Sequence, residues 1–140
     1  MNSLPSPAAS VLLVKDDKVL LIKRGKQPSK GLWSLPGGSK EDDESFEECA
    51  KRELFEETAL VVDELENIGT RERVSLDANG NVARRYIITT FLAFQFSGSL
   101  KAGDDAADAG WFTYVQVQNL QTTDGLMEFL TEHANAGFGL

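Results

Sequence analysis

Cysteine, histidine and long apolar runs are all scarce in this sequence. The one cysteine, Cys49, excludes an internal disulfide, and the one histidine, His133, lies near the C-terminus, which argues against a Cys–His catalytic pair. No apolar run approaches the roughly 20 residues of a transmembrane helix. Residues 1–7 also lack the basic and apolar regions of a signal peptide. We therefore expect a cytoplasmic protein that spans no membrane and keeps Cys49 reduced.

Positive charge is outnumbered, because 14 Lys and Arg residues face 22 Asp and Glu residues and leave a net charge of −8. The imbalance is local, since residues 41–57 hold nine of the acids and two of the bases. Without a strongly basic face, nucleic-acid binding is not expected. Bases gather on both sides of the acidic stretch, which would suit a phosphate-bearing small molecule, although ordinary charge on strand edges is the alternative. They are Lys15, Lys18, Lys23, Arg24, Lys26, Lys30, Arg71, Arg73, Arg84 and Arg85.

Length and composition predict one globular domain over residues 1–140, because 41% of the residues are hydrophobic and 26% are charged. Asn79-Gly80 is a strong signal for a hairpin turn. Asp124 is placed to cap a last helix. Runs of β-branched and apolar residues predict strands at 8–14, 18–23, 61–76, 82–96 and 110–117.

A turn and a helix stand at the centre of the sequence. Residues 35–38, Leu-Pro-Gly-Gly, predict a turn, because proline lacks an N–H and glycine favours unusual dihedral angles. A helix is expected from Ser45, since no Gly or Pro follows until well past Leu60. At about 100° per residue, one arc of this helix is apolar at its start and acidic at its end. The arc consists of Phe46, Cys49, Ala50, Glu53, Glu56 and Glu57.

The acidic end of this arc favours a bound cation. Like charges three or four residues apart on a helix repel each other, and carboxylate oxygens suit a hard ion such as Mg²⁺ or Mn²⁺. The alternative is a solvent-exposed charged face, which is the commoner fate of a Glu-rich helix.

The spacing of residues Gly38–Leu60 resembles the Nudix box. That signature runs glycine, five residues, Glu, seven residues, Arg-Glu-aliphatic, any residue, Glu-Glu, any residue, Gly-aliphatic. Every fixed position is matched except Ala59, where the family has Gly. We interpret Ala59 as a local cost in stability of about 1 kcal/mol if its backbone is left-handed. The resemblance implies an α/β fold, a Nudix-type α/β/α sandwich with a mixed β-sheet and the box helix beside it.

The resemblance also implies roles for single residues in a metal-dependent pyrophosphohydrolase. Divalent metal, Mg²⁺ or Mn²⁺, would be held by Glu56, Glu57 and the carbonyl of Gly37. Glu53 would be either a further ligand or the base that acts on water. Arg52 would orient these carboxylates with Glu44 as its partner, or would contact phosphate directly.

A further acid is expected from outside the box, because Nudix enzymes often take one from a loop. Asp104 and Asp105 form the only acidic pair after residue 100, and Asp105 is the favoured candidate. A polar loop tip without a catalytic role is the alternative.

Residues 24–38 resemble the segment before the box in the ADP-ribose pyrophosphatase-like branch of the family. This implies a nucleoside diphosphate substrate such as ADP-ribose, with Arg24, Trp33 and Gly38 as substrate-binding residues. Trp33 could stack on a base or be buried. Two other functions stay open: a pyrophosphohydrolase acting on damaged nucleoside triphosphates, and a ligand-binding sensor without catalysis. A homodimer is also possible.

Overall fold

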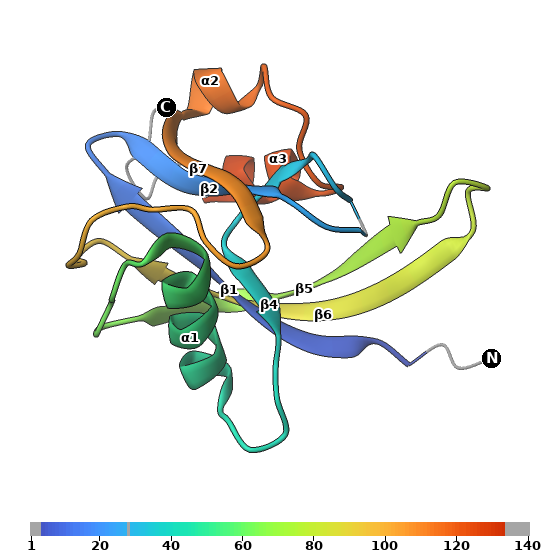
Figure 1. Cartoon of the computed structure of the whole chain (residues 1–140), viewed down its shortest axis with the longest axis horizontal. Helices are drawn as coiled ribbons and strands as arrows, with labels where there is room; N and C mark the ends of the chain where they lie inside the picture. Colours follow the sequence, from blue (N-terminus) through green and yellow to red (C-terminus); the bar gives the residue numbers. More distant parts are fainter. Residues whose placement is uncertain (1–3, 28, 134–140) are drawn as a thin grey trace.

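The computed structural model describes residues 4–27 and 29–133. A mixed sheet lies between a long helix on one side and two shorter helices on the other (Figure 1). None of the helices in the described ranges is long and apolar enough to cross a membrane. The elements in order are β1 (Ser6–Lys15), β2 (Lys18–Arg24), β3 (Trp33–Ser34), β4 (Gly37–Ser39), α1 (Phe46–Thr58), β5 (Glu66–Leu76), β6 (Val82–Ala93), β7 (Ala106–Thr113), α2 (Tyr114–Val117) and α3 (Leu126–Glu132).

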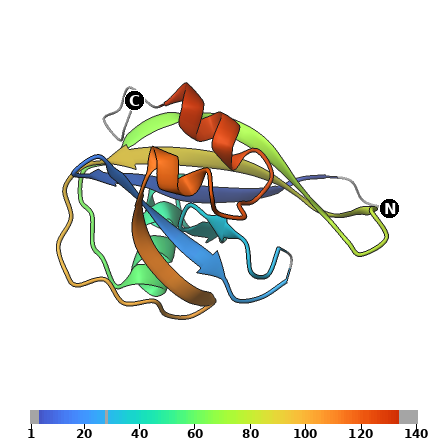
Figure 2. The same cartoon turned by 90° about the horizontal axis from the view of Figure 1, so that it is seen from above.

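Strand β1 is the centre of the sheet. It pairs in parallel with β6 and antiparallel with β4 and β2, while β5 pairs antiparallel with β6. Strand β2 carries β3 and β7, both antiparallel. β1 and β2 pair only near their shared turn, from Val14 opposite Val19 to Lys15 opposite Lys18. Beyond that turn the two strands diverge, and the sheet opens into two branches (Figure 2).

Each face of β1 packs against a different helical layer. Val11 and Leu13 lie in one apolar cluster with Cys49 and Leu54 of α1. Leu12 lies in a second cluster with apolar residues of α2 and α3. Because successive side chains of a strand point to opposite faces, the buried part of this central strand is apolar on both faces except at Ser10, whose hydroxyl is hydrogen-bonded to that of Thr90. The predicted α/β sandwich, with a mixed sheet and the box helix beside it, is confirmed.

Both ends of α1 have local causes. The Ser45 side chain accepts from the Glu48 N–H and the Glu48 side chain accepts from the Ser45 N–H, which forms a capping box. The helix ends at Thr58 because Ala59 takes a left-handed conformation, with φ of 65°. Its N–H donates to the Phe55 carbonyl over 2.8 Å. Ala59 thus has the left-handed backbone that makes Gly the less strained residue at the end of a helix.

The predicted turn at residues 35–38 is partly wrong, because Gly37–Ser39 forms strand β4 and pairs with β1. Neither Gly37 nor Gly38 has a positive φ. Glycine is needed at residue 37 because the backbones of β4 and β1 approach each other closely. A Cβ on Gly37 would lie 2.3 Å from the Ala9 carbonyl oxygen, which brings β4 tightly against β1.

The predicted strand at 110–117 is also shifted. Strand β7 spans Ala106–Thr113, and helix α2 follows because Thr113 and Gln116 form a second capping box. Helix α3 begins after Gly125, whose φ is 84°, with no side-chain cap, so the assignment of Asp124 as its cap was wrong. Strand β5 starts at Glu66 and β6 ends at Ala93, so both are shorter than the ranges 61–76 and 82–96.

Candidate active site

The principal pocket of the described structure, about 310 Å³ in volume, opens where β1 and β2 diverge. Its walls come from β1, β2, β4, β5, β6 and the last turns of α1. Acids and bases are unequally distributed within it. Glu53, Glu57 and Asp105 supply the carboxylates, and the bases that line it are Arg24, Lys26, Arg71 and Arg73.

Glu57 is the most deeply buried carboxylate of this pocket, with 5% of its surface exposed. Its Oε1 accepts a hydrogen bond from the Gly37 N–H over 2.8 Å. Burial raises the pKa of Glu57 to about 8, and the negative charge of Glu53 acts in the same direction. Burial also raises the pKa of Glu53, which the nearby charge of Arg52 partly offsets. This end of the pocket therefore holds two carboxylates whose ionised forms are disfavoured by burial.

Gly38 leaves space for the Glu53 carboxylate because it has no side chain. A Cβ at Gly38 would lie 2.5 Å from Glu53 Oε1 and 2.7 Å from Oε2, closer than real Cβ atoms approach other atoms. The backbone of β4 and the carboxylate of α1 therefore meet at a distance that only glycine permits. This contact explains why glycine is needed at residue 38 of β4, although its φ is not positive.

Arg52 links the acids on the outer side of α1. Its Nε and Nη2 donate to the two carboxylate oxygens of Glu44 over 3.0 and 2.8 Å, so the two residues that the resemblance implied as partners form a bidentate pair. Its Nη1 donates to Glu53 Oε2 over 2.9 Å and to Glu56 Oε1 over 3.2 Å. The hydrogen bonds from Arg52 lower the pKa of Glu44 to about 2, although burial opposes them. Arg52 therefore holds Glu53 in place, and its Nη2 also donates to the Ser39 carbonyl over 3.1 Å.

The carboxylates are not gathered as metal ligands are. Within residues 4–27 and 29–133, no three His, Cys, Asp or Glu side chains lie close enough together to hold a metal ion. Glu57 is turned to the Gly37 N–H, and Glu53 and Glu56 are turned to Arg52. All three come from one turn of α1, and their oxygen donors suit Mg²⁺ or Mn²⁺. The carboxylate oxygens of the three glutamates, with the space that Gly38 leaves beside Glu53, fit such an ion once these side chains rotate toward one another.

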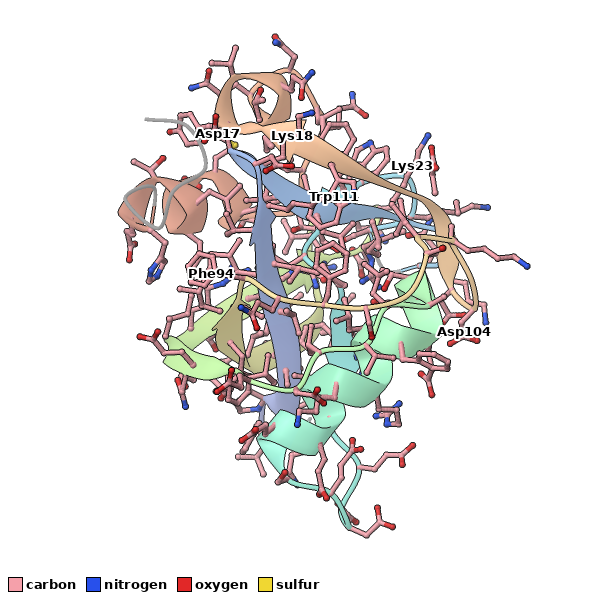
Figure 3. All side chains as sticks on the ribbon, turned by 90° about the vertical axis from the view of Figure 1, so that its left-hand side faces the viewer. Asp17, Lys18, Lys23, Phe94, Asp104 and Trp111 are labelled. Carbon is pink, nitrogen blue, oxygen red and sulfur yellow. The ribbon has the colours of Figure 1, made fainter. Side chains whose placement is uncertain are left out.

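The loop before β7 closes the acidic end of the pocket. The Gly103 N–H donates to the Glu57 carbonyl over 3.1 Å, so the loop lies against the C-terminal end of α1. Asp104 lies at this point beside the helix (Figure 3). Asp105 lines the pocket, and its carboxylate pairs with the Lys26 ammonium over 2.8 Å. Asp105, which the sequence favoured over its neighbour, is thus the loop acid that reaches the pocket wall.

The predicted substrate-binding residues separate into two groups. Arg24 and Gly38 line the pocket. Trp33 is absent from its lining and belongs to the apolar cluster on the α3 side, with its ring 5.0 Å from that of Phe112 in an edge-on arrangement. The structure therefore places Trp33 with the core that supports β2 and β3.

Sequence reasoning missed which bases reach the pocket. Arg71 and Arg73 of β5 line it, as does Tyr86 of β6, whereas Arg84 and Arg85 do not. All four arginines stood out equally in the sequence as basic residues. The strand period of two would have placed Arg71 and Arg73 on one face, but only the sheet pairing shows that this face borders the pocket.

A model of the NUDIX domain matches residues 4–132 of the chain. An ADP-ribose pyrophosphatase of Methanocaldococcus jannaschii is 40% identical over 108 residues, which are 77% of this chain and 62% of that protein. An 8-oxo-dGDP phosphatase of Mus musculus is 31% identical over 112 residues, 77% of this chain and 32% of that protein. The matches therefore span less than two thirds of the length of either relative.

Solved structures have the same fold. A MutT NUDIX hydrolase from Burkholderia pseudomallei has a TM-score of 0.77 at 25% identity, covering 96% of this chain and 98% of that one. The NUDIX domain of Shewanella oneidensis NrtR, in complex with ADP ribose, has a TM-score of 0.78 at 25% identity, covering 96% and 90%. Together with the box from Gly38 to Leu60 and the α/β sandwich around it, these matches show that the chain belongs to the Nudix family.

Proposed function

We propose that this protein hydrolyses the diphosphate linkage of a nucleoside diphosphate derivative, with ADP-ribose as the first candidate. The observation that carries the proposal is one pocket lined by the carboxylates of Glu53 and Glu57, by Arg24, whose charge acts on Glu57, and, as its guanidinium end, by Arg71 and Arg73. A diphosphate needs a cation such as Arg24 to neutralise its charge, and carboxylates that hold metal or activate water. The ADP-ribose pyrophosphatase relative and the ADP-ribose-bound NUDIX domain support the choice of substrate.

Divalent metal is part of this proposal. Glu56, Glu57 and the Gly37 carbonyl would hold Mg²⁺ or Mn²⁺, with Glu53 as a further ligand or as the base. When bound, the ion would neutralise charge on the diphosphate and favour the ionised form of water. Burial makes the ionised form of Glu57 unfavourable despite the positive charge of Arg24, so a cation here would also stabilise the ionised site.

The protein's own groups would divide the remaining work. Arg52 is a positioning residue in this proposal, because it holds Glu44, Glu53 and Glu56 at once and does not line the pocket. Asp105 would receive a proton from water or help to bind the metal, after release from Lys26. Arg24, whose charge acts on both Glu57 and Arg73, would contact the phosphates between the two ends.

A second candidate function is hydrolysis of oxidised nucleotides. It is favoured by the likeness to the 8-oxo-dGDP phosphatase of Mus musculus, at a lower identity than that of the first relative. A non-catalytic sensor is a third outcome, although every glutamate of the box is present in this chain.

A substrate panel tests the proposal directly. ADP-ribose, 8-oxo-dGDP and 8-oxo-dGTP are each incubated with the full chain and Mg²⁺, and the products are separated by chromatography. We expect AMP and ribose 5-phosphate from ADP-ribose at the highest kcat/KM of the three. Faster hydrolysis of an oxidised nucleotide would favour the second function. Tight binding of ADP-ribose without formation of products would favour a sensor.

A further inference from the structure

The guanidinium end of the pocket has more positive charge than its surroundings balance. Arg71 and Arg73 stand two residues apart on β5, so their side chains leave the same face of the strand. Both line the pocket that contains Glu53 and Glu57. Arg73 is 9% exposed, a degree of burial that a charged side chain rarely has without a partner.

Among the described residues, the neighbours of Arg73 supply one hydrogen bond and no ion pair. Its Nη2 donates to Ser29 Oγ over 3.0 Å, and its guanidinium lies 5.6 Å from the centre of the Tyr86 ring. Its Nε is buried and has no hydrogen-bond partner. In the described part of the chain, Arg73 forms no ion pair.

Arg71 is held in a similar way. Its guanidinium lies 4.9 Å from the centre of the Phe129 ring of α3, and its Nε is likewise buried without a partner. Asp124 and Glu132 act on Arg71 through their negative charge, and Asp124 also acts on Arg73, but in the described structure neither acid forms an ion pair with either arginine. A buried cation, Arg73, and a half-buried cation, Arg71, thus lie near each other and repel.

Burial is the main cause that lowers the pKa of Arg73, to about 10, and the positive charges of Arg24 and Arg71 add to it. Leaving a buried charge unpaired is costly, and an anion held by hydrogen bonds removes most of that cost. A planar guanidinium with free donors binds a phosphate group especially well, because two parallel hydrogen bonds can form.

In the proposed function the diphosphate lies at the carboxylates, where Arg24, whose charge acts on both Glu57 and Arg73, contacts it. The charge that remains for Arg71 and Arg73 must then come from another part of the substrate.

We propose that Arg71 and Arg73 form a subsite for a phosphate monoester carried by the substrate at a distance from its diphosphate. The preferred substrates are then nucleoside diphosphate derivatives with a third phosphate group, for example on a ribose hydroxyl. This inference rests on the proposed function for the position of the diphosphate, but the subsite itself is a property of β5.

Matched substrate pairs test the preference. The pairs differ only in the monoester: ADP-ribose and its 2′-phosphate, NAD and NADP, and dephospho-coenzyme A and coenzyme A. We expect the phosphorylated member of at least one pair to have a KM that is lower by about tenfold or more. One hydrogen bond to a charged group contributes enough binding free energy for such a change. Arg73→Met should abolish this ratio, and Arg73→Lys should retain part of it. Arg85→Met, which removes an exposed charge from the opposite face of β6, should leave the ratio unchanged.

A binding measurement separates the subsite from the reaction. Inorganic phosphate is titrated into the full chain in the presence of EDTA, so that the carboxylate end repels the anion, and amide NMR shifts report the binding. We expect shifts centred on Arg71, Arg73 and Tyr86 in the wild type and in Arg85→Met, and none in folded Arg73→Met. Turnover without a monoester preference in any pair, or phosphate binding unchanged in Arg73→Met, would overturn the inference. Absence of turnover with every compound would instead contradict the proposed function, and the titration would then decide the subsite alone.

Discussion

The Gly37 N–H donates to Glu57 Oε1 over 2.8 Å, which joins the short strand β4 directly to the last turn of α1. The two residues are 20 positions apart in the sequence, at opposite ends of the glycine–helix segment. The bond is possible because β4 pairs closely with β1 and because α1 packs its apolar arc on the same strand. The geometry of the candidate site is thus set by the core beneath it.

The contact of Gly38 with Glu53 predicts that Gly38→Ala impairs hydrolysis. The new Cβ would lie 2.5 Å from the carboxylate, so Glu53 must move, and a displacement of about 1 Å in an active site can cost roughly 100-fold in rate. Steady-state kcat/KM with ADP-ribose measures the effect. Gly110→Ala is the control, since its Cβ would meet only the Phe112 ring at 3.3 Å and should change the rate little. Equal rates for both variants would mean that Glu53 needs no such fixed position.

The position of Asp105 predicts that Asp105→Asn slows turnover far more than Asp108→Asn. Asp105 lines the pocket, whereas the exposed Asp108 of β7 accepts from the Ala109 N–H and does not line it. A general base contributes about 100-fold or more to a rate, so we expect a fall of that order in kcat for Asp105→Asn alone. The check is a comparison of kcat values at saturating ADP-ribose. Small and equal effects would place the additional acid elsewhere in the chain.

The left-handed backbone of Ala59 predicts that Ala59→Gly stabilises the protein by up to about 1 kcal/mol. Relief of the clash at φ of 65° contributes roughly 1–2 kcal/mol, and the greater freedom of glycine in the unfolded chain removes about 0.4–1 kcal/mol. Urea unfolding should show a higher midpoint with an unchanged slope. Ala83→Gly, on an exposed position of β6 without positive φ, should lower the midpoint instead. A lower midpoint for Ala59→Gly would mean that its surroundings have adapted to the methyl group.

The Glu44–Arg52 pair predicts a stability difference that disappears in acid. Hydrogen bonds from Arg52 lower the pKa of Glu44 from 4.5 to about 2. The carboxylate therefore stabilises the fold fully above about pH 4.5, and this contribution is lost as the pH falls toward 2. We expect Glu44→Gln to be less stable than the wild type in urea at pH 7, with a smaller difference at pH 3. Glu47→Gln, which breaks only an exposed pair with Lys51 at 3.8 Å, should show a small difference at both values. A Glu44→Gln difference that did not shrink with acid would assign its cause to packing.

Features set by neighbouring residues could be predicted from the sequence. The apolar arc of Cys49 and Ala50 follows from the helical period, and the pairing of Arg52 with Glu44, which the resemblance implied, is present. The start of α2 was also readable, because Thr113 and Gln116 have capping-box spacing, but the signal was overlooked.

Features set by distant pairing could not be predicted in this way. Gly37 and Gly38 were expected in a turn, because nothing local shows that β1 lies close enough to pair with them. The half-buried position of Trp33 could not be predicted for the same reason, since its contact with Phe112 depends on β2 lying between β3 and β7. The sequence also does not distinguish Arg73 from Arg85, because the face of the sheet on which each lies depends on the register of β5 against β6.

The central claim is that the glutamates of α1 bind a divalent metal that hydrolysis requires, and Glu57→Gln tests it most directly. Initial rates with ADP-ribose are measured for the wild type, Glu57→Gln and the exposed control Glu64→Gln, each with Mg²⁺ and with excess EDTA, after circular dichroism has confirmed folding. We predict full activity for the wild type and Glu64→Gln with Mg²⁺, loss of both activities in EDTA, and a rate at least about 100-fold lower for Glu57→Gln, as expected when a group essential to catalysis is removed. Undiminished turnover by folded Glu57→Gln, or by the wild type in EDTA, would contradict the account.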